Sequence, residues 1–209
     1  MPVLDFWFEF ASTYSYPAAM RIGALAEAAG VTVHWRPFLL GPIFKEQGWD
    51  TSPFNLYPAK GRYMWRDVER VCDALGLPFR KPEPFPQWSL LAARVTLVGL
   101  EATWGPDFVR AVYRAEFGEG RPINDQAVIA DILKSLNVEP EAALARAQSD
   151  EIKTRLRTQI EEARTLGIFG APSFITRDGE LFWGNDRLET ALGWADGRAH
   201  PDHLKPPKR

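Results

Sequence analysis

The sequence predicts an α/β fold that carries an all-helical insertion. Residues 3–39 show the strand–helix–strand pattern of a βαβ unit. Residues 150–192 combine a long amphipathic helix, two short apolar runs and a final helix. Between these parts, residues 62–147 show helical patterns alone. Because both ends of the chain supply strands, we expect them to form one sheet that is interrupted by the helical block.

The βαβ unit begins with residues 3–10, whose aromatic side chains are typical of a buried strand. A helix is expected from about residue 18 to residue 29, and Gly30 is a favourable residue for ending it. Residues 31–39 then alternate apolar and polar side chains and predict a second strand. The crossover in such a unit is nearly always right-handed, so we expect the two strands to be parallel.

The middle of the chain begins with an irregular segment, residues 41–54, which contains Phe44, Trp49 and Phe54. A loop of this length in a folded protein is usually functional, and its aromatic residues indicate ordered packing near a ligand or a partner. Asn124 stands at the expected N-cap of one of the later helices. The predicted helices are 62–75, 89–104, 107–117, 125–136 and 140–147.

The C-terminal part begins with a helix from Asp150 to about residue 166. Two apolar runs follow, and Asp178-Gly179 between them is a strong signal for a hairpin. A final helix is expected to start at residues 184–187 and to continue through Leu192. The proline-rich and basic residues after His200 predict a tail that packs loosely or not at all.

Composition excludes several classes of protein. The 209 residues are 45% hydrophobic and 25% charged, an ordinary globular balance, and the net charge of -2 gives no electrostatic case for binding nucleic acid. No long apolar run or signal-peptide pattern is visible, so we expect no membrane span and a cytoplasmic location. The single cysteine, Cys72, excludes an intramolecular disulfide, and no metal-ligand spacing is present.

A Ser-x-x-Ser motif, Ser12 to Ser15, lies between the first strand and the first helix. The first turn of a helix has unpaired N–H groups and a partial positive charge. A hydroxyl at this place can donate a hydrogen bond to a thiolate on another molecule, and charge-assisted bonds are about twice as strong as neutral ones. The alternative is that Ser12 only caps the helix, since serine is a favoured N-cap residue.

Four segments in order give the chain a specific resemblance. They are Phe-Glu-Phe-Ala-Ser-Thr-Tyr-Ser-Tyr ending at Tyr16, Tyr-Pro-Ala-Lys-Gly-Arg-Tyr-Met at 57–64, Phe-Gly-Ala-Pro at 169–172 and Trp-Gly-Asn-Asp-Arg-Leu at 183–188. This combination resembles the kappa-class glutathione transferases and the 2-hydroxychromene-2-carboxylate isomerases, relatives of the DsbA-type oxidoreductases. In these thioredoxin-like proteins the serines stand where others carry a Cys-x-x-Cys pair.

The resemblance implies a thioredoxin-like fold of the DsbA and kappa-transferase type. On this basis residues 1–45 and 155–200 form a discontinuous thioredoxin-like domain, 46–154 a helical insertion domain, and 201–209 a tail. It also implies a cis peptide bond between Ala171 and Pro172, although X–Pro bonds in general favour trans.

The resemblance further implies glutathione as cofactor. Ser12 matches the serine that hydrogen-bonds the glutathione sulfur, and Ala171 matches the residue whose backbone pairs with the cysteinyl unit. Asn185 and Asp186 match the pair at the γ-glutamyl end, and Lys60 a basic residue near the glycine carboxylate. Thr13 replaces a proline of many relatives, and the family's asparagine has no clear counterpart around residues 49–51. The implied binding residues are Ser12, Thr13, Tyr14, Lys60, Ala171, Pro172, Asn185 and Asp186.

Several of these residues have a purely structural alternative. Lys60 is equally well a solvated lysine at a helix start, and Asn185 is a plausible N-cap for the final helix. Cys72 lies on the apolar stripe of its helix and is expected to be a small buried side chain rather than a catalytic thiol. Arg62 and Arg66 are one turn apart and could hold a substrate carboxylate, although solvated surface arginines are the commoner case.

The activity that the resemblance implies is the interconversion of 2-hydroxychromene-2-carboxylate and trans-o-hydroxybenzylidenepyruvate through reversible addition of the glutathione thiolate. A small aromatic substrate and a homodimer belong to the same expectation. One alternative is a kappa-class-like glutathione S-transferase. A dithiol oxidoreductase is disfavoured because the Cys-x-x-Cys pair is absent. A non-catalytic module that binds glutathione or a peptide is the alternative from another class.

Overall fold

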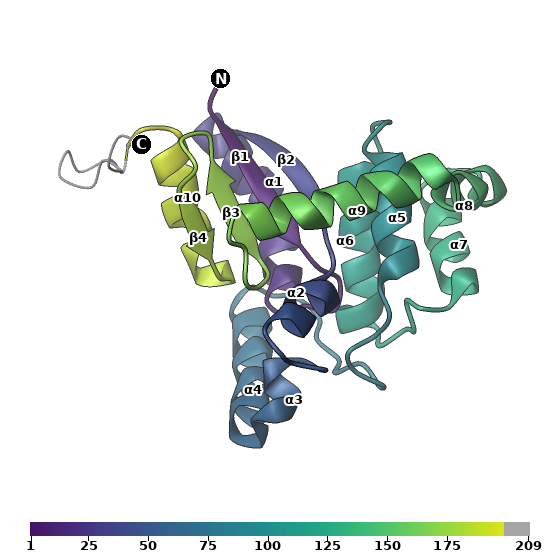
Figure 1. Cartoon of the computed structure of the whole chain (residues 1–209), viewed down its shortest axis with the longest axis horizontal. Coiled ribbons are helices and arrows are strands. Elements are labelled where there is room, and N and C mark those ends of the chain that lie inside the picture. The colour runs from purple at the N-terminus through teal and green to yellow at the C-terminus, as the bar shows by residue number, and fades with distance from the viewer. Residues whose placement is uncertain (199–209) are drawn as a thin grey trace.

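Strand β1 (Val3–Phe8) lies inside a four-stranded sheet of order β2-β1-β3-β4 (Figure 1). The structure is a computed structural model and describes residues 1–198. β1 pairs in parallel with β2 (Thr32–Pro37) and antiparallel with β3 (Ser173–Thr176), and β4 (Leu181–Trp183) pairs antiparallel with β3. Both ends of the chain therefore contribute to one sheet, and the parallel βαβ unit is confirmed.

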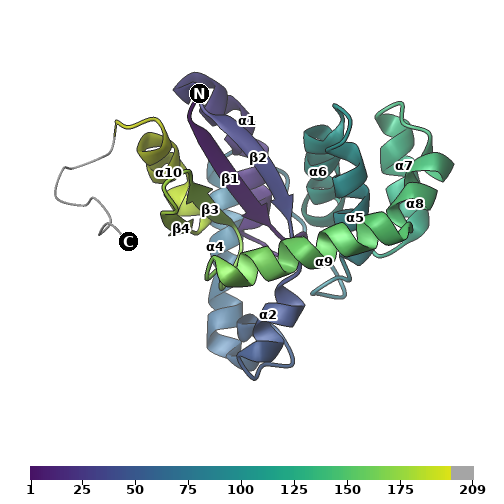
Figure 2. The same ribbon diagram turned by 45° about the horizontal axis from the view of Figure 1, so that its top comes forward.

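Helices cover both faces of this sheet. The side chains of β1 alternate between the two faces and are largely apolar on both, so each face needs a helical layer to bury it. Leu4, Phe6 and Phe8 pack in one core with α1 (Ser15–Ala29) and α10 (Leu188–Ala195). Trp7 points to the other face and packs in a second core, to which α9 (Asp150–Thr165) contributes Ile152, Leu156 and Ile160. Figure 2 shows α9 running from the sheet towards the helical part of the molecule.

The helices of the middle segment follow β2 along the chain and precede α9. They are α4 (Pro58–Ala74), α5 (Leu90–Gly99), α6 (Gly105–Tyr113), α7 (Gln126–Ser135) and α8 (Pro140–Ala147). In Figures 1 and 2, α5, α6, α7 and α8 gather beside the sheet, whereas α4 lies apart from them. The fold is the predicted thioredoxin-like α/β fold, and the placement of domain boundaries at residues 45 and 155 stays a prediction.

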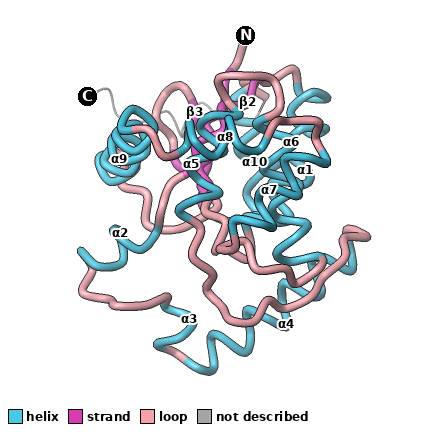
Figure 3. Tube along the Cα trace, turned by 90° about the vertical axis from the view of Figure 1, so that its right-hand side faces the viewer, coloured by secondary structure: helices cyan, strands magenta, loops and turns pink. Residues whose placement is uncertain are grey.

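The segment predicted as irregular contains two short helices, α2 (Leu40–Glu46) and α3 (Pro53–Leu56) (Figure 3). The hydroxyl of Ser52 accepts a hydrogen bond from the Phe54 N–H and caps α3. α4 begins at Pro58, before the predicted start at residue 62, because proline suits the first turn of a helix. Helices this short show too little periodicity to be recognised in the sequence.

Two further boundaries differ from the prediction. Asp125, and not Asn124, caps α7, and its carboxylate accepts a 2.8 Å hydrogen bond from the Ala127 N–H. α5 ends at Gly99 rather than at residue 104, and the chain then turns so tightly that a Cβ on Gly99 would lie 2.9 Å from the Gly105 Cα. α6 then continues into a π-helical turn, η1 (Arg114–Gly118).

The predicted hairpin between β3 and β4 is confirmed, and Gly179 supplies the positive φ of 87° at its turn. A 3-10 turn, η2 (Asn185–Arg187), precedes α10. The predicted tail, 201–209, lies outside the described residues. In the described part of the chain, no helix has the length and apolar composition needed to cross a bilayer.

Candidate functional site

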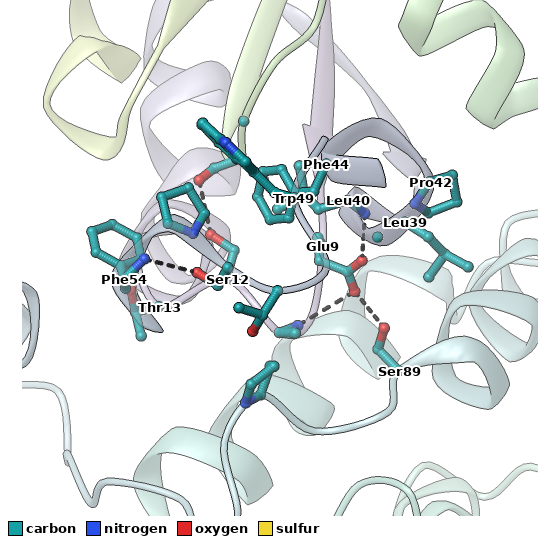
Figure 4. Close-up of a pocket in the computed structure, with 18 of the residues that line it drawn as sticks. Glu9, Ser12, Thr13, Leu39, Leu40, Pro42, Phe44, Trp49, Phe54 and Ser89 are labelled. Atoms are coloured by element: carbon teal, nitrogen blue, oxygen red, sulfur yellow. Dashed lines mark hydrogen bonds between the residues drawn. The ribbon is translucent and has the colours of Figure 1, made fainter. Parts of the chain in front are cut away.

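A cavity of ≈ 370 Å³ opens where the loop after β1 meets the turn before β3 (Figure 4). The segment from α2 to the start of α4 forms one wall, and residues 86–90 form another. This volume falls within the range of roughly 300–1,000 Å³ that is typical of small-molecule sites. The segment predicted as irregular, residues 41–54, contributes its aromatic residues Phe44, Trp49 and Phe54 to the lining of this cavity.

Ser12 is 92% buried at this cavity, and its hydroxyl donates a 2.8 Å hydrogen bond to the Ala171 carbonyl oxygen. Helix α1 begins three residues later, at Ser15, and the residue at its N-cap, Tyr14, makes no side-chain capping bond. The hypothesis that Ser12 is merely the helix cap is therefore wrong. Its hydroxyl instead joins the first strand's loop to the C-terminal half of the chain.

Ala171 stands on the turn that leads into β3, and the peptide bond to Pro172 is cis, as the resemblance implies. The Ala171 carbonyl accepts from Ser12, while the Ala171 N–H has no hydrogen-bond partner among residues 1–198. The Pro172 carbonyl accepts a 3.0 Å bond from the Gly184 N–H, and Pro172 does not line the cavity. Ala171 thus presents backbone groups that an extended ligand can pair with.

Thr13, Tyr14 and Lys60 also line the cavity. The Tyr14 hydroxyl donates a 2.8 Å bond to Asp67 on α4, and burial together with this carboxylate raises the pKa of Tyr14 above its ordinary value. The ammonium of Lys60 lies 5.8 Å from the centre of the Phe54 ring. The structure therefore brings Ser12, Thr13, Tyr14, Lys60 and Ala171 together around one cavity.

Asn185 and Asp186 lie outside the lining of this cavity, although Trp183, just before them, belongs to it. The guanidinium of Arg21 donates to both the backbone carbonyl and the side-chain oxygen of Asn185, at 3.2 and 3.1 Å. Asn185 does not cap the final helix, because Arg187 occupies the N-cap position of α10. The Asp186 side chain is 72% exposed, and its carboxylate lies 3.6 Å from the Arg187 guanidinium.

The arginines and the cysteine of α4 do not belong to the cavity. Arg62 and Arg66 are exposed, and Arg66 forms a 2.5 Å ion pair with Glu69. Cys72 is fully buried, and burial raises the pKa of its thiol to about 11. Its interpretation as a small core side chain is confirmed, and such a thiol carries little thiolate at neutral pH.

Sequence reasoning missed Glu9, whose carboxyl group lies at the cavity although the residue is only 4% exposed. One carboxyl oxygen accepts a 2.9 Å bond from the Leu40 N–H, and the other accepts from the Ser89 hydroxyl (Figure 4). Burial raises the pKa of Glu9 above its ordinary value, although these hydrogen bonds act in the opposite direction. The available signal was a lone carboxyl group within the apolar run from Phe6 to Phe10.

Aromatic rings supply much of the remaining surface of the cavity. Phe44 and Trp49 have ring centres 5.9 Å apart in one wall, and Phe169 and Trp183 have centres 5.1 Å apart in another. Trp88 is 74% exposed at the same cavity. Such walls suit a flat apolar ligand. Within residues 1–198, no group of three or more potential ligand side chains is placed to hold a metal ion.

Comparisons with known proteins agree with this fold. The family model of the DSBA-like thioredoxin domain matches residues 3–193, so the chain belongs to that family. A 2-hydroxychromene-2-carboxylate isomerase of Sphingobium xenophagum is 28% identical over 190 residues, which cover 89% of this chain and 94% of the relative. Glutathione S-transferase kappa 2 of Caenorhabditis elegans is 26% identical over 203 residues, covering 89% and 88% of the two chains.

Solved structures give the same result. A 2-hydroxychromene-2-carboxylate isomerase superimposes with a TM-score of 0.81 at 26% identity, covering 92% of this chain and 95% of the other. A probable DsbA oxidoreductase of Streptomyces coelicolor superimposes with a TM-score of 0.77 at 18% identity, covering 100% and 93%. The resemblance identified in the sequence is therefore confirmed, and the named isomerase and transferase relatives indicate an enzyme.

Proposed function

We propose that this protein is a glutathione-dependent isomerase that interconverts 2-hydroxychromene-2-carboxylate and trans-o-hydroxybenzylidenepyruvate. The observation that carries the proposal is the meeting of the Ser12 hydroxyl and the Ala171 backbone at one cavity. A thiol-bearing peptide can use both groups: its sulfur can accept a hydrogen bond from the Ser12 hydroxyl, and its backbone can pair with the Ala171 backbone. The isomerase relatives, which align over most of both chains, favour this reaction.

Glutathione would lie along the turn before β3 as an extended peptide. The N–H and carbonyl of Ala171 would pair with its cysteinyl unit in the manner of an added strand. Because the Ala171 carbonyl would then accept from the ligand, the Ser12 hydroxyl would turn to donate to the sulfur. Lys60 would face the glycine carboxylate, and Asn185 and Asp186 would meet the γ-glutamyl end, where the exposed Asp186 suits the free ammonium. Thr13, Tyr14 and Pro172 would complete the binding site.

The reaction would start from the thiolate that Ser12 favours. The ring C–O bond of 2-hydroxychromene-2-carboxylate breaks as its 2-hydroxyl group loses a proton and the ring oxygen gains one, which gives the open-chain ketone with a cis double bond. The sulfur then adds to the conjugated carbon of this ketone, and the former double bond becomes a single bond about which the chain rotates. Elimination restores the double bond and releases the thiolate, so that glutathione emerges unchanged. A larger thiolate fraction and aligned binding both raise the rate. The aromatic walls would hold the phenyl ring of the substrate.

A glutathione S-transferase is the second candidate, because kappa-class relatives match at nearly the same identity and coverage. The same thiolate site would serve it, but a thioether would be the product. A dithiol oxidoreductase is disfavoured, because the sequence contains only one cysteine, Cys72. This thiol is buried, and burial raises its pKa.

The first test is a calorimetric titration with reduced glutathione, beside S-methylglutathione as the matched ligand without a thiol proton. We expect saturable binding that S-methylation weakens. The chromene substrate is then assayed with glutathione present in catalytic amount. An isomerase leaves the glutathione concentration unchanged, whereas a transferase consumes it with an aromatic electrophile. Absence of binding at millimolar glutathione would refute both candidates.

We further propose that the protein acts as a homodimer in the cytoplasm, as the family resemblance implies. Sedimentation equilibrium at micromolar concentration measures the mass of the particle in solution and so tests the dimer. A mass of two chains supports the dimer, and a mass of one chain at all concentrations refutes it.

A further inference from the structure

Glu9 is the acidic side chain that lies deepest at the candidate site. It directly follows β1, and its carboxyl group borders the same cavity as Ser12 (Figure 4). Its backbone carbonyl accepts a 2.9 Å bond from the Tyr113 hydroxyl and a 3.0 Å bond from the Ser12 N–H. The residue is therefore fixed relative to the serine that would hold the glutathione sulfur.

The carboxyl group itself is held in one orientation. The Leu40 N–H donates to one oxygen at 2.9 Å, while the Ser89 hydroxyl and, at 3.4 Å, the Ala11 N–H donate to the other. These donors come from three different segments, so a rotation of the carboxyl group would break several bonds at once. Such a fixed acid is suited to transferring a proton at one position.

The surroundings of Glu9 favour its neutral form. Burial removes water from the carboxyl group, and the cavity wall around it is largely apolar and aromatic. The titratable groups that interact with it are Tyr113 from α6 and Glu116 from η1, and Asp50 and Lys60 line the same cavity. The Lys60 ammonium is exposed, whereas Glu116 is itself a buried carboxyl group. Glu9 can thus hold a proton at a pH where an exposed glutamate has lost it.

We propose that Glu9 is a second catalytic residue, which gives a proton to the substrate's carbonyl oxygen while the glutathione sulfur bonds to the conjugated carbon. This inference rests on the proposed function. As the C–S bond forms, the electrons of the C=C bond move towards the carbonyl carbon and those of the C=O bond move to oxygen. The oxygen takes the Glu9 proton and becomes an enol. After rotation, the Glu9 carboxylate takes the proton back, the C=O and C=C bonds return, and the thiolate leaves.

The direct test is Glu9→Gln, which keeps the shape of the side chain. The amide oxygen can accept from the Leu40 N–H and the amide nitrogen can donate to the Ser89 oxygen, so that only the 3.4 Å bond from the Ala11 N–H is lost. We expect kcat to fall by about 10²-fold or more, the usual contribution of a general acid. Glutathione affinity and the ultraviolet absorbance of the bound thiolate should stay at the wild-type level. Glu116→Gln is the matched control, a buried carboxyl group outside the cavity, and should keep the wild-type kcat.

The pH profile gives an independent readout. If Glu9 must be protonated, wild-type kcat falls as the pH rises through the Glu9 pKa, and Glu9→Gln abolishes this alkaline limb. The Ser89 hydroxyl lowers the pKa of Glu9, so Ser89→Ala should move the limb to higher pH. This shift is not expected of a merely structural contact.

Three outcomes would overturn the inference: turnover of Glu9→Gln at the wild-type rate, loss of the thiolate absorbance in Glu9→Gln, or an alkaline limb that Ser89→Ala leaves unmoved. A loss of the thiolate would mean that Glu9 acts on the sulfur rather than on the substrate. A wild-type protein that binds no glutathione would instead refute the proposed function, and that result is visible before any variant is made.

Discussion

The hydroxyl of Ser12 and the carbonyl of Ala171, 159 positions apart in the sequence, are joined by a 2.8 Å hydrogen bond. A serine hydroxyl has one proton to donate. Donation to a glutathione sulfur therefore requires the bond to Ala171 to be exchanged for one from the ligand. In the proposed complex the two residues would be coupled, because the ligand N–H that pairs with the Ala171 carbonyl would take the place of the Ser12 hydroxyl.

Ser12→Ala should raise the pKa of the bound glutathione thiol by about 1–2 units, because a hydrogen bond to a charged group contributes roughly 1.5–3 kcal/mol. Titration of the thiolate absorbance against pH in the saturated complex measures this shift. Glutathione affinity well below the thiol pKa should change little, since the backbone contacts at Ala171 remain.

The second serine of the motif provides the control. Ser15 is fully buried in α1 and does not line the cavity. Ser15→Ala should therefore leave the thiol pKa at the wild-type value. Equal pKa shifts in both variants would mean that the motif acts through the stability of the helix start and not through the Ser12 hydroxyl.

Much of the fold could be predicted from the sequence because long periodic patterns determine it. The βαβ unit, the hairpin at Asp178-Gly179 and helix α8 all follow from local patterns. The contact between Ser12 and Ala171 came from the family resemblance, since no local pattern links positions so far apart. Helices α2 and α3 were missed because a segment of four to seven residues carries almost no helical period.

The side chains of the site were less predictable, because their orientation depends on tertiary packing. Glu9 could not be placed at the cavity without knowing that Leu40 and Ser89 donate to it. Asn185 was expected to be available to a ligand, but its side-chain oxygen accepts from Arg21 on α1. In both cases the partner belongs to another element of the fold, and spacing along the chain does not show it.

Lys60→Met should weaken glutathione binding about 2- to 5-fold at low salt, and less at high salt. The ammonium is exposed, so its attraction to a carboxylate is screened and contributes at most roughly 1 kcal/mol. Calorimetry at two ionic strengths measures the change. Arg66→Met, on the same helix but outside the cavity, should have no effect. Equal losses in the two variants would point to the general charge of α4 rather than to a contact of Lys60.

Gly61→Ala should destabilise the wall of the cavity formed by α3 and α4. A Cβ at Gly61 would lie 2.3 Å from the Phe54 carbonyl oxygen, so α3 would have to move. Overpacking of this kind costs roughly 1–3 kcal/mol. Urea denaturation should show this loss, and glutathione affinity should fall because Phe54, which lines the cavity, shifts with α3.

A second glycine substitution separates the clash from the general effect of alanine. Gly23 lies in α1, and the nearest atom to a Cβ there would be 3.7 Å away, an ordinary contact. Gly23→Ala should therefore stabilise the protein by about 0.5–1 kcal/mol, as expected for glycine replaced inside a helix. If Gly61→Ala did not lower the free energy of unfolding either, the predicted clash between α3 and α4 would be refuted.

Glu116 makes the stability of the protein depend on pH. Its side chain is fully buried, and neither carboxyl oxygen has a hydrogen-bond partner among the described residues. Burial raises the pKa of Glu116 well above its ordinary value of 4.5, and Glu9 acts in the same direction once it is ionised. The folded state therefore holds this proton more tightly than the unfolded state does.

The sign of the effect follows from this difference in proton binding. The stabilisation is fully present below pH 4.5, the ordinary carboxyl pKa, and it is lost as the pH rises through the raised pKa of the folded state. The free energy of unfolding should then fall by up to about 1.4 kcal/mol per pH unit for each such group. Glu116→Gln removes one titrating group, so its stability should fall less between pH 5 and about pH 8. Urea denaturation at the two pH values measures the slope, and parallel wild-type and variant curves would show that Glu116 is ionised in the folded protein.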